Sequence, residues 1–490
     1  MERTLVLDNG SDTIKAGFAG MPESDVKVIP NCAARTNLKR ILVADQVANY
    51  FRPTGLYSWR PFEDGYLTDL ELEKAVWKRA LGGDVLKVTP QETHLITTAP
   101  PCNPDVLECG FEELIFEEFG FSSLYITTPA TLSFLDFAEQ NPSLPSAKSG
   151  MGMVVDVGFS STTVMPVLGH AAEPGLARRL SVGGKVMHNY LATLVSQRHV
   201  DVMNEPRAVR DMFEQLCYVA GDFTQAMAND KELQASFELP DYASHPHSSG
   251  QAQTPVASPA AGGEKNLQSG GGSTGGGGSG HSITLSRERV CVPEGLFEPF
   301  DFGIDEYGVV DAVMDSAAAS NETVQTFFQN YASKSKAPRA RRGKKVLLGE
   351  AQPTSLLDHD EVYSVLMSSV ILTGGGCRLR GLRERFAVQL QASAPQLSPV
   401  HVYGGARPQA EKEKIVGAGM DPMFAAWRGG CFLAGLDVYQ REMRVTKSEY
   451  LENGHSICSD RFYETAAQGY KNDLNAEVIR KLKELEEIRK

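Results

Sequence analysis

The chain has no apolar run of the length that a membrane helix or a secretory signal needs. Only three apolar residues, Leu5 to Leu7, follow the first four positions before Asp8, too few for a signal-peptide core. No stretch approaches the roughly 18 apolar residues of a membrane span. The eight cysteines include no C-x-x-C pair and no cluster with histidine at ligand spacing. We therefore expect no membrane segment, free intracellular thiols and no metal-thiolate site.

Basic charge is also scarce over the chain as a whole. The 48 Lys and Arg residues are outnumbered by 61 Asp and Glu residues, which gives a formal net charge of -13. This balance excludes a protein covered in positive charge for nucleic-acid binding, although it permits one local patch. With 490 residues, 42% of them apolar, the chain has ample material for a core. Its length suggests about three domains or lobes.

Two segments stand apart from this composition. Residues 240–282 carry 11 of the 46 glycines and few apolar side chains, so we interpret them as a disordered Gly/Ser-rich insertion. Residues 334–345 contain seven basic and no acidic residues. Such a run is a solvated loop, a DNA contact or a nuclear import signal. Its basic residues are Lys334, Lys336, Arg339, Arg341, Arg342, Lys344 and Lys345.

Short β-rich runs alternate with helical patterns elsewhere, which predicts an α/β protein. The expected strands are 4–7, 94–97, 124–126, 153–155 and 370–372, and the expected helices are 69–81, 109–119, 185–196 and 206–227. Residues 466–490 are expected to contain an amphipathic helix, because Leu474, Val478, Leu482 and Leu485 follow 4-4-3 spacing. We expect this stripe to pack on the body of the protein, the alternative being a surface for a partner.

Two similar motifs carry the strongest chemical signal. In the first, an apolar run meets Asp8-Asn9-Gly10, and Asn-Gly between apolar runs marks a tight hairpin turn with positive φ. The N–H groups of such a turn can cradle a phosphate, to which Ser11 would add a hydroxyl and Lys15 a positive charge. The pattern recurs 148 residues later as Asp156-Val157-Gly158. The recurrence predicts a duplicated architecture in which two phosphate-binding turns face each other.

Two further features fit a nucleotide site. Carboxylates at both turns, Asp8 and Asp156, suit Mg²⁺, which keeps several waters while it contacts phosphates. A Gly-rich element, 374–376, lies between an apolar run and an expected helix, where glycines let a nucleotide approach the backbone closely.

These three elements, in this order, resemble the two phosphate loops and the adenosine loop of the actin superfamily. Further segments are similar to actin segments: 209–220, 293–299, 426–434 and 448–454. The resemblance implies an α/β, actin-like fold of duplicated α/β lobes, with four subdomains around a nucleotide cleft. Residues 1–145 and 422–465 would form the outer lobe, with an abbreviated second subdomain at about 31–64. Residues 146–421 would form the inner lobe, with insertions at 240–282 and 323–363 and a C-terminal helix in 466–490.

The cofactor that the resemblance implies is ATP or ADP with Mg²⁺. The metal would be held through water by Asp8 and Asp156. The implied nucleotide-binding residues are Asp8, Asn9, Gly10, Ser11, Lys15, Asp156, Gly158, Ser160, Gly183, Gly184, Glu214, Gly374, Gly375 and Gly376.

Departures from the actin pattern imply that the nucleotide is not hydrolysed. Actins orient the attacking water with a glutamine and a histidine, and the aligned residues here are Pro129 and Thr163. Phe159 replaces a carboxylate of the second loop, and Asp12 replaces a glycine beside the phosphates. The adenine surroundings differ at Phe213, Gly376, Arg378 and Leu379. The resemblance therefore implies a protein that binds nucleotide and has no catalytic residues. The alternative is a weak ATPase.

Four more segments resemble one branch of nuclear actin-related proteins: 28–32, 61–67, 114–118 and 452–456. Members of that branch are scaffold subunits of the remodelling complex that exchanges a core nucleosomal histone for its variant form. The resemblance implies a nuclear protein, present also in the cytoplasm, that contacts a remodelling motor subunit, a zinc-finger subunit and nucleosomal DNA. The short 31–64 segment and the two insertions imply that it forms no filament.

Overall fold

The computed structural model describes residues 3–50, 55–239, 282–320, 323, 364–395, 400–405, 420–463 and 468–489. The predicted insertions, apart from Ser282 and Thr323, lie outside these ranges, as does the basic run 334–345. All eight cysteines lie inside them, and none forms a disulfide. None of the described helices is long and apolar enough to cross a membrane.

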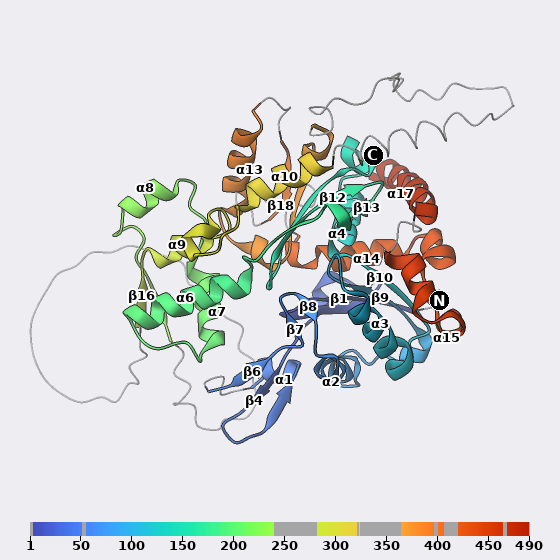
Figure 1. Ribbon diagram of the computed structural model, residues 1–490, viewed down its shortest axis with the longest axis horizontal. Helices are drawn as coiled ribbons and strands as arrows, with labels where there is room; N and C mark the ends of the chain where they lie inside the picture. Colours follow the sequence, from blue (N-terminus) through green and yellow to red (C-terminus); the bar gives the residue numbers. More distant parts are fainter. Residues whose placement is uncertain are drawn as a thin grey trace, which may run out of the picture.

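Two six-stranded sheets of matching topology form the framework (Figure 1). In the first sheet, the antiparallel hairpin of β1 and β2 lies beside β9 and β10, which run parallel to β1. In the second sheet, the hairpin of β11 and β12 lies beside β17 and β18, which run parallel to β11. Both hairpins therefore occupy the same place in their sheets, which confirms the predicted α/β actin-like architecture.

Each of the five predicted strands lies within an observed strand, namely β1, β9, β10, β11 or β17. The first sheet consists of β1 (Arg3–Asn9), β2 (Thr13–Phe18), β3 (Lys27–Pro30), β9 (Thr93–Thr98), β10 (Ser123–Thr127) and β19 (Val445–Thr446). The second consists of β11 (Gly152–Val157), β12 (Thr162–Leu168), β13 (Ala171–Ala172), β14 (Arg178–Leu180), β17 (Val370–Thr373) and β18 (Val402–Gly404). Six consecutive residues of β1 and all four of β17 are buried, as expected for strands covered on both faces.

Smaller strand pairs and helices surround the two sheets. The predicted short segment contains β4 (Ala33–Arg35), β5 (Ile41–Val43), α1 (Asp45–Ala48) and β6 (Tyr57–Trp59), followed by β7 (Phe62–Glu63) and β8 (Tyr66–Leu67). A further pair consists of β15 (Ala235–Glu238) and β16 (Ser282–Leu285). The helices beyond this segment include α2 (Leu70–Leu81), α5 (Pro145–Ser149), α6 (Gly184–Arg198), α9 (Glu288–Glu294), α10 (Val309–Ala319), α13 (Leu382–Ser393), α15 (Lys447–Asn453) and α16 (His455–Cys458).

Two helices form a layer between the sheets (Figure 1). The helix α4 (Pro129–Gln140) contacts strands of the second sheet, whereas α14 (Ala425–Ala434) contacts β1 and β2 of the first. Gly429 of α14 faces the backbone of Leu132 in α4, and no side-chain atom separates the two helices there. Their contact therefore fixes how far apart the two hairpins lie.

Two helix predictions were wrong in extent. The segment 206–227 was expected to be one helix but forms α7 (Pro206–Leu216) and α8 (Phe223–Ala228). The break arises because the N–H groups of Tyr218 and Val219 donate to the carbonyls of Arg289 and Arg380, tertiary bonds that compete with the helical ones. The helix expected at 109–119 begins earlier, as α3 (Asp105–Glu113), and continues as a π-helical turn, Leu114–Phe119.

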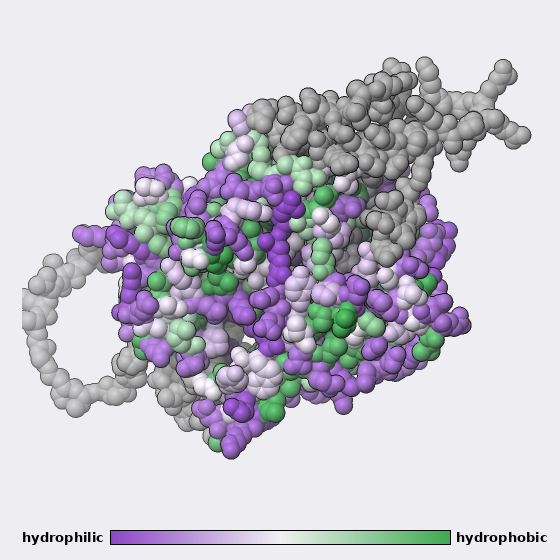
Figure 2. All heavy atoms as spheres, in the orientation of Figure 1, coloured by the Kyte–Doolittle hydropathy of each residue, from purple (hydrophilic) through white to green (hydrophobic). Residues whose placement is uncertain are grey.

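The C-terminal helix α17 (Gln468–Arg489) packs on the body of the protein, as predicted. Leu474, Val478 and Leu482 are fully buried in the core beside α4 and α14. The position of α17 on the body is also fixed by Glu477, whose carboxylate accepts hydrogen bonds from the N–H groups of Asp437 and Val438. On the face shown in Figure 2, the described residues mix polar side chains with several separate groups of apolar ones.

Candidate functional site

The two hairpins border one cavity of about 540 Å³ between the sheets. All but one of the predicted nucleotide-binding residues line it, together with Pro129, Thr163, Phe159 and Phe213. The exception is Gly183, at the N-terminus of α6, where a Cβ atom would lie 2.7 Å from the carbonyl oxygen of Phe159. Gly183 therefore lies against the backbone of the second loop, outside the cavity lining, whereas Gly184 is part of that lining. Binding of nucleotide by this set stays a prediction.

The first hairpin differs from the tight turn that Asn9-Gly10 predicted. The strand β1 continues through Asn9, so that the connection is the three-residue loop 10–12, and neither Asn9 nor Gly10 has a positive φ. A Cβ atom on Gly10 would lie 2.6 Å from the carbonyl oxygen of Thr13. The glycine is thus needed for a close backbone approach and not for a left-handed conformation.

Asp8 is held in place by two neighbours. Thr98 Oγ1 donates to Asp8 Oδ1 at 2.9 Å, and Lys15 Nζ lies 3.1 Å from Asp8 Oδ2. Burial by itself would lower the pKa of Lys15, but the carboxylate of Asp8, together with those of Asp156 and Asp12, outweighs burial and raises that pKa. Lys15, the predicted phosphate ligand, is therefore charged and already paired with an aspartate.

Asp156 lies on the opposite hairpin, in register with Thr163 of β12. Burial, together with the nearby charge of Asp8, raises the pKa of Asp156 to about 6. Two carboxylates that repel each other are stabilised by a divalent cation, and Mg²⁺ accepts one or two carboxylates while it keeps its waters. No group of three or more potential ligands is assembled within the described ranges. The two carboxylates are therefore suited to a Mg²⁺ ion held through water, with phosphate oxygens as its further ligands.

Asp12 is the centre of an ion-pair cluster that the sequence did not reveal. Its Oδ1 lies 2.7 Å from an Arg60 nitrogen and 2.6 Å from an Arg210 nitrogen. Burial alone would raise the pKa of Asp12, yet the two arginines outweigh it and lower that pKa. Arg210 belongs to α7, which packs against α6 and β15, so its bond to the first hairpin crosses the cavity.

An aromatic group covers the same end of the cavity. Arg60 lies 4.7 Å from the centre of the Phe159 ring, and His188 of α6 contacts the edges of Phe159 and Phe213. Burial and the charge of Arg210 lower the pKa of His188 to about 4. A histidine of that pKa is a weak proton acceptor.

Sequence reasoning did not assign roles to Arg60, Thr98 and His188. Of these three, only Thr98 could have been found from the sequence. It follows the expected strand 94–97, and ligands bind where the carboxyl ends of parallel strands meet at one edge of a sheet. Arg60 and His188 lie in a loop and a helix with no motif around them.

A buried carboxyl group lies under the first hairpin. Glu73 of α2 is fully buried near Asn9, Asn31 and Trp77, and neither carboxyl oxygen has a hydrogen-bond partner of ordinary geometry among the described residues. Burial raises its pKa to about 7, although the surrounding polar side chains oppose the shift.

Glu73→Gln is expected to stabilise the protein above neutral pH. The unfolded chain has the lower pKa of 4.5, so Glu73 costs stability progressively as pH rises from about 4.5 through 7. The variant should gain up to about 3 kcal/mol at pH 8 and show a flatter pH dependence in urea unfolding. Glu71→Gln, at an exposed position of the same helix, is the control and should not change the profile. Parallel profiles of Glu73→Gln and the parent chain would contradict this account.

Comparison with known proteins identifies the family. A model of the actin family matches residues 1–463. The chain belongs to the actin family. The actin-related protein 6 of Oryza sativa subsp. indica is 31% identical over 478 residues, covering 94% of this chain and 98% of that protein. The same-named protein of Drosophila melanogaster is 31% identical over 466 residues, covering 93% and 99%, and that of Arabidopsis thaliana 29% over 477 residues, covering 94% and 100%.

These similarities confirm the predicted resemblance to one branch of the actin-related proteins. Within the actin framework, Pro129 begins α4 and Thr163 lies across from Asp156, and both residues line the cavity. Proline has no polar side-chain atom. The actin fold is kept, and the loss of the groups that position water in actins stays a prediction.

Proposed function

We propose that this chain is a structural, actin-fold subunit of a nuclear chromatin-remodelling complex that exchanges a core nucleosomal histone for its variant form. It would serve as a scaffold for a remodelling motor subunit and a zinc-finger subunit and as a contact to nucleosomal DNA, without forming filaments. The observation that carries the proposal is similarity to proteins named actin-related protein 6 along 94% of the chain.

The cavity supports binding of nucleotide without turnover. Asp8, Asp156 and the glycines of 374–376 border a space with the chemistry for a nucleotide and Mg²⁺. When bound, Mg²⁺ would neutralise the phosphates, and the loop N–H groups would hold them. Hydrolysis also needs a group that orients water, and Pro129, Thr163 and Phe159 supply no suitable base. A bound nucleotide would then stabilise the fold by mass action.

The scaffold proposal is tested by isolating the tagged full-length chain from nuclear extract. We expect it to copurify with a remodelling ATPase and a zinc-finger subunit, and the isolated assembly to bind nucleosomes. Replacing the seven basic residues of 334–345 with Ala should weaken that binding and reduce its salt dependence, because fewer counterions are released. Unchanged nucleosome binding with lost nuclear accumulation would assign the run to import. Isolation without any remodelling subunit would contradict the proposal.

A weak ATPase remains the second candidate, because Asp8 and Asp156 are both kept at the cavity. Acid extraction identifies any nucleotide bound to the purified chain, and steady-state assays follow ATP turnover. We expect no turnover above that of the Asp156→Ala variant. Sustained hydrolysis by the parent chain that disappears in Asp156→Ala would favour the ATPase.

A further inference from the structure

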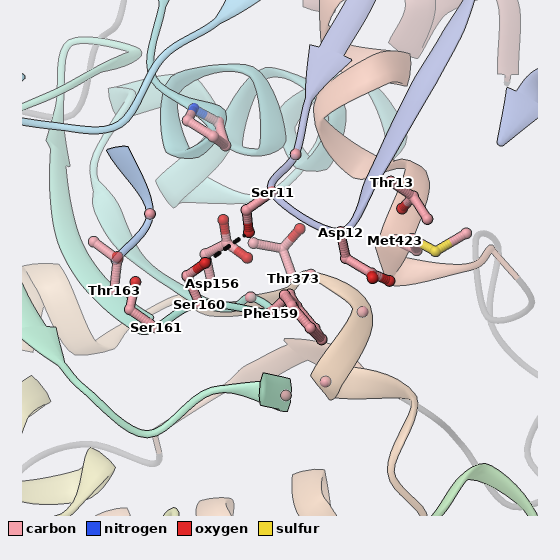
Figure 3. Close-up of a pocket in the computed structure, with 18 of the residues that line it drawn as sticks. Ser11, Asp12, Thr13, Asp156, Phe159, Ser160, Ser161, Thr163, Thr373 and Met423 are labelled. Atoms are coloured by element: carbon pink, nitrogen blue, oxygen red, sulfur yellow. Dashed lines mark hydrogen bonds between the residues drawn. The ribbon is translucent and has the colours of Figure 1, made fainter. Parts of the chain in front are cut away.

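The two loops that border the cavity touch each other at their tips. Ser160 Oγ donates a hydrogen bond to Ser11 Oγ at 2.8 Å, and the two side chains point toward each other in Figure 3. A phosphoryl group held between two hydroxyls would accept a bond from each and keep the two hydroxyl oxygens roughly 5 Å apart. The observed contact therefore leaves no room for a phosphoryl group between the loop tips.

An ion-pair cluster fills the adjacent space, and Asp12 supplies the anion that its two arginines bind. The Asp12 carboxylate belongs to the first loop and is fixed by Arg60 and Arg210. Arg60 is held further by bonds to the backbone carbonyls of Ser11, Asp12 and Asn31. Because Asp12 already binds both arginines, a phosphoryl group placed here would have to displace the Asp12 carboxylate from them, and the two anions would repel each other.

The acidic and basic side chains of the described lining are equal in number. Apart from His188 and Cys217, its ionisable side chains are four acids and four bases: Asp8, Asp12, Asp156, Glu214, Lys15, Arg210, Arg378 and Arg380. Arg60 lies outside this lining but is paired with Asp12. Three of the bases are paired, Lys15 with Asp8, Arg210 with Asp12, and Arg378 with Asp421. Mg²⁺ would offset part of the charge of either nucleotide, but a triphosphate brings one more negative charge than a diphosphate, and each additional buried charge without a partner is costly.

We infer that this cleft takes a nucleoside diphosphate and excludes a triphosphate. The Ser11–Ser160 contact and the Asp12 ion pairs stand in place of a terminal phosphate and join the two loops directly. This inference rests on the proposed nucleotide site. It adds that the loops are held together by the chain's own side chains, so that the terminal phosphate is not needed to close the cleft.

Calorimetric titration of the nucleotide-free full chain with Mg²⁺ present tests this selectivity. The probes are ADP and the non-hydrolysable β,γ-imido analogue of ATP. We expect ADP to bind at least tenfold more tightly than the analogue. Asp12→Gly should strengthen binding of the analogue at least tenfold and change ADP binding less than threefold, and Ser160→Ala should act in the same direction more weakly. Asp421→Asn, which removes a carboxylate from another ion pair of the cleft, should affect both ligands equally.

The outcomes separate this inference from the proposed site. Equal or tighter binding of the analogue by the parent chain overturns the diphosphate selectivity while leaving a nucleotide site. ADP preference that persists unchanged in Asp12→Gly and Ser160→Ala overturns the assignment to these side chains. Failure of the parent chain to bind either ligand overturns both the inference and the nucleotide site. Unfolding curves of the unliganded variants establish that each is folded before titration.

Discussion

Arg428→Met is expected to lower the free energy of unfolding by about 3–5 kcal/mol. Arg428 of α14 makes a two-pronged ion pair with Asp136 of α4, with both N–O distances at 2.9 Å, and it also binds Glu23 at 2.7 Å. Asp136 is only 5% exposed. Removing the guanidinium would leave a buried carboxylate without its counter-charge, which costs far more than the pair itself contributes.

Urea unfolding of two comparison variants tests whether the loss of stability comes from the buried charge of Asp136. Arg480→Met removes the pairs of an exposed arginine with Glu484 and Glu477 on the same helix and should cost less than about 1 kcal/mol. The double variant Arg428→Met/Asp136→Leu should recover most of the loss, because it removes the stranded charge as well. If Arg428→Met costs no more than Arg480→Met, burial of Asp136 is not what makes the pair important.

Gly429→Ala is expected to destabilise the protein by about 3 kcal/mol or more, although alanine ordinarily favours a helix. A Cβ atom at this position would lie 1.7 Å from the carbonyl oxygen of Leu132. Because that oxygen is part of the α4 backbone, the two helices must move apart, and their packing with the sheets is lost.

Gly435→Ala is the matched control for this substitution. Gly435 follows the same helix, and its nearest neighbour would lie at 3.4 Å from the new Cβ atom, so we expect a change within about 1 kcal/mol. Thermal unfolding measures both variants. A Gly429→Ala protein as stable as the parent would show that the spacing of α4 and α14 is adjustable. Since these helices lie between the two hairpins, a stable but displaced pair should also change ADP affinity.

Local sequence patterns were sufficient for much of the framework. The short β-rich runs of the sequence became β1, β9, β10, β11 and β17, whose residues are mostly buried, as is typical of strands covered on both faces. The spacing of Leu474, Val478 and Leu482 placed the apolar stripe of α17 correctly. The sequence pattern overestimated the length of the helix expected at 206–227, because the N–H groups of Tyr218 and Val219 form tertiary hydrogen bonds instead of helical ones.

The sequence by itself determined the two hairpins that carry Asp8 and Asp156 and the glycines around the cavity. These features depend on residue type and short spacing. Only the tertiary structure decided what Asp12 does, because its partners Arg60 and Arg210 lie 48 and 198 residues away. The Ser11–Ser160 contact likewise joins residues 149 positions apart. Local spacing cannot specify such contacts, since they depend on how α4 and α14 set the distance between the two sheets.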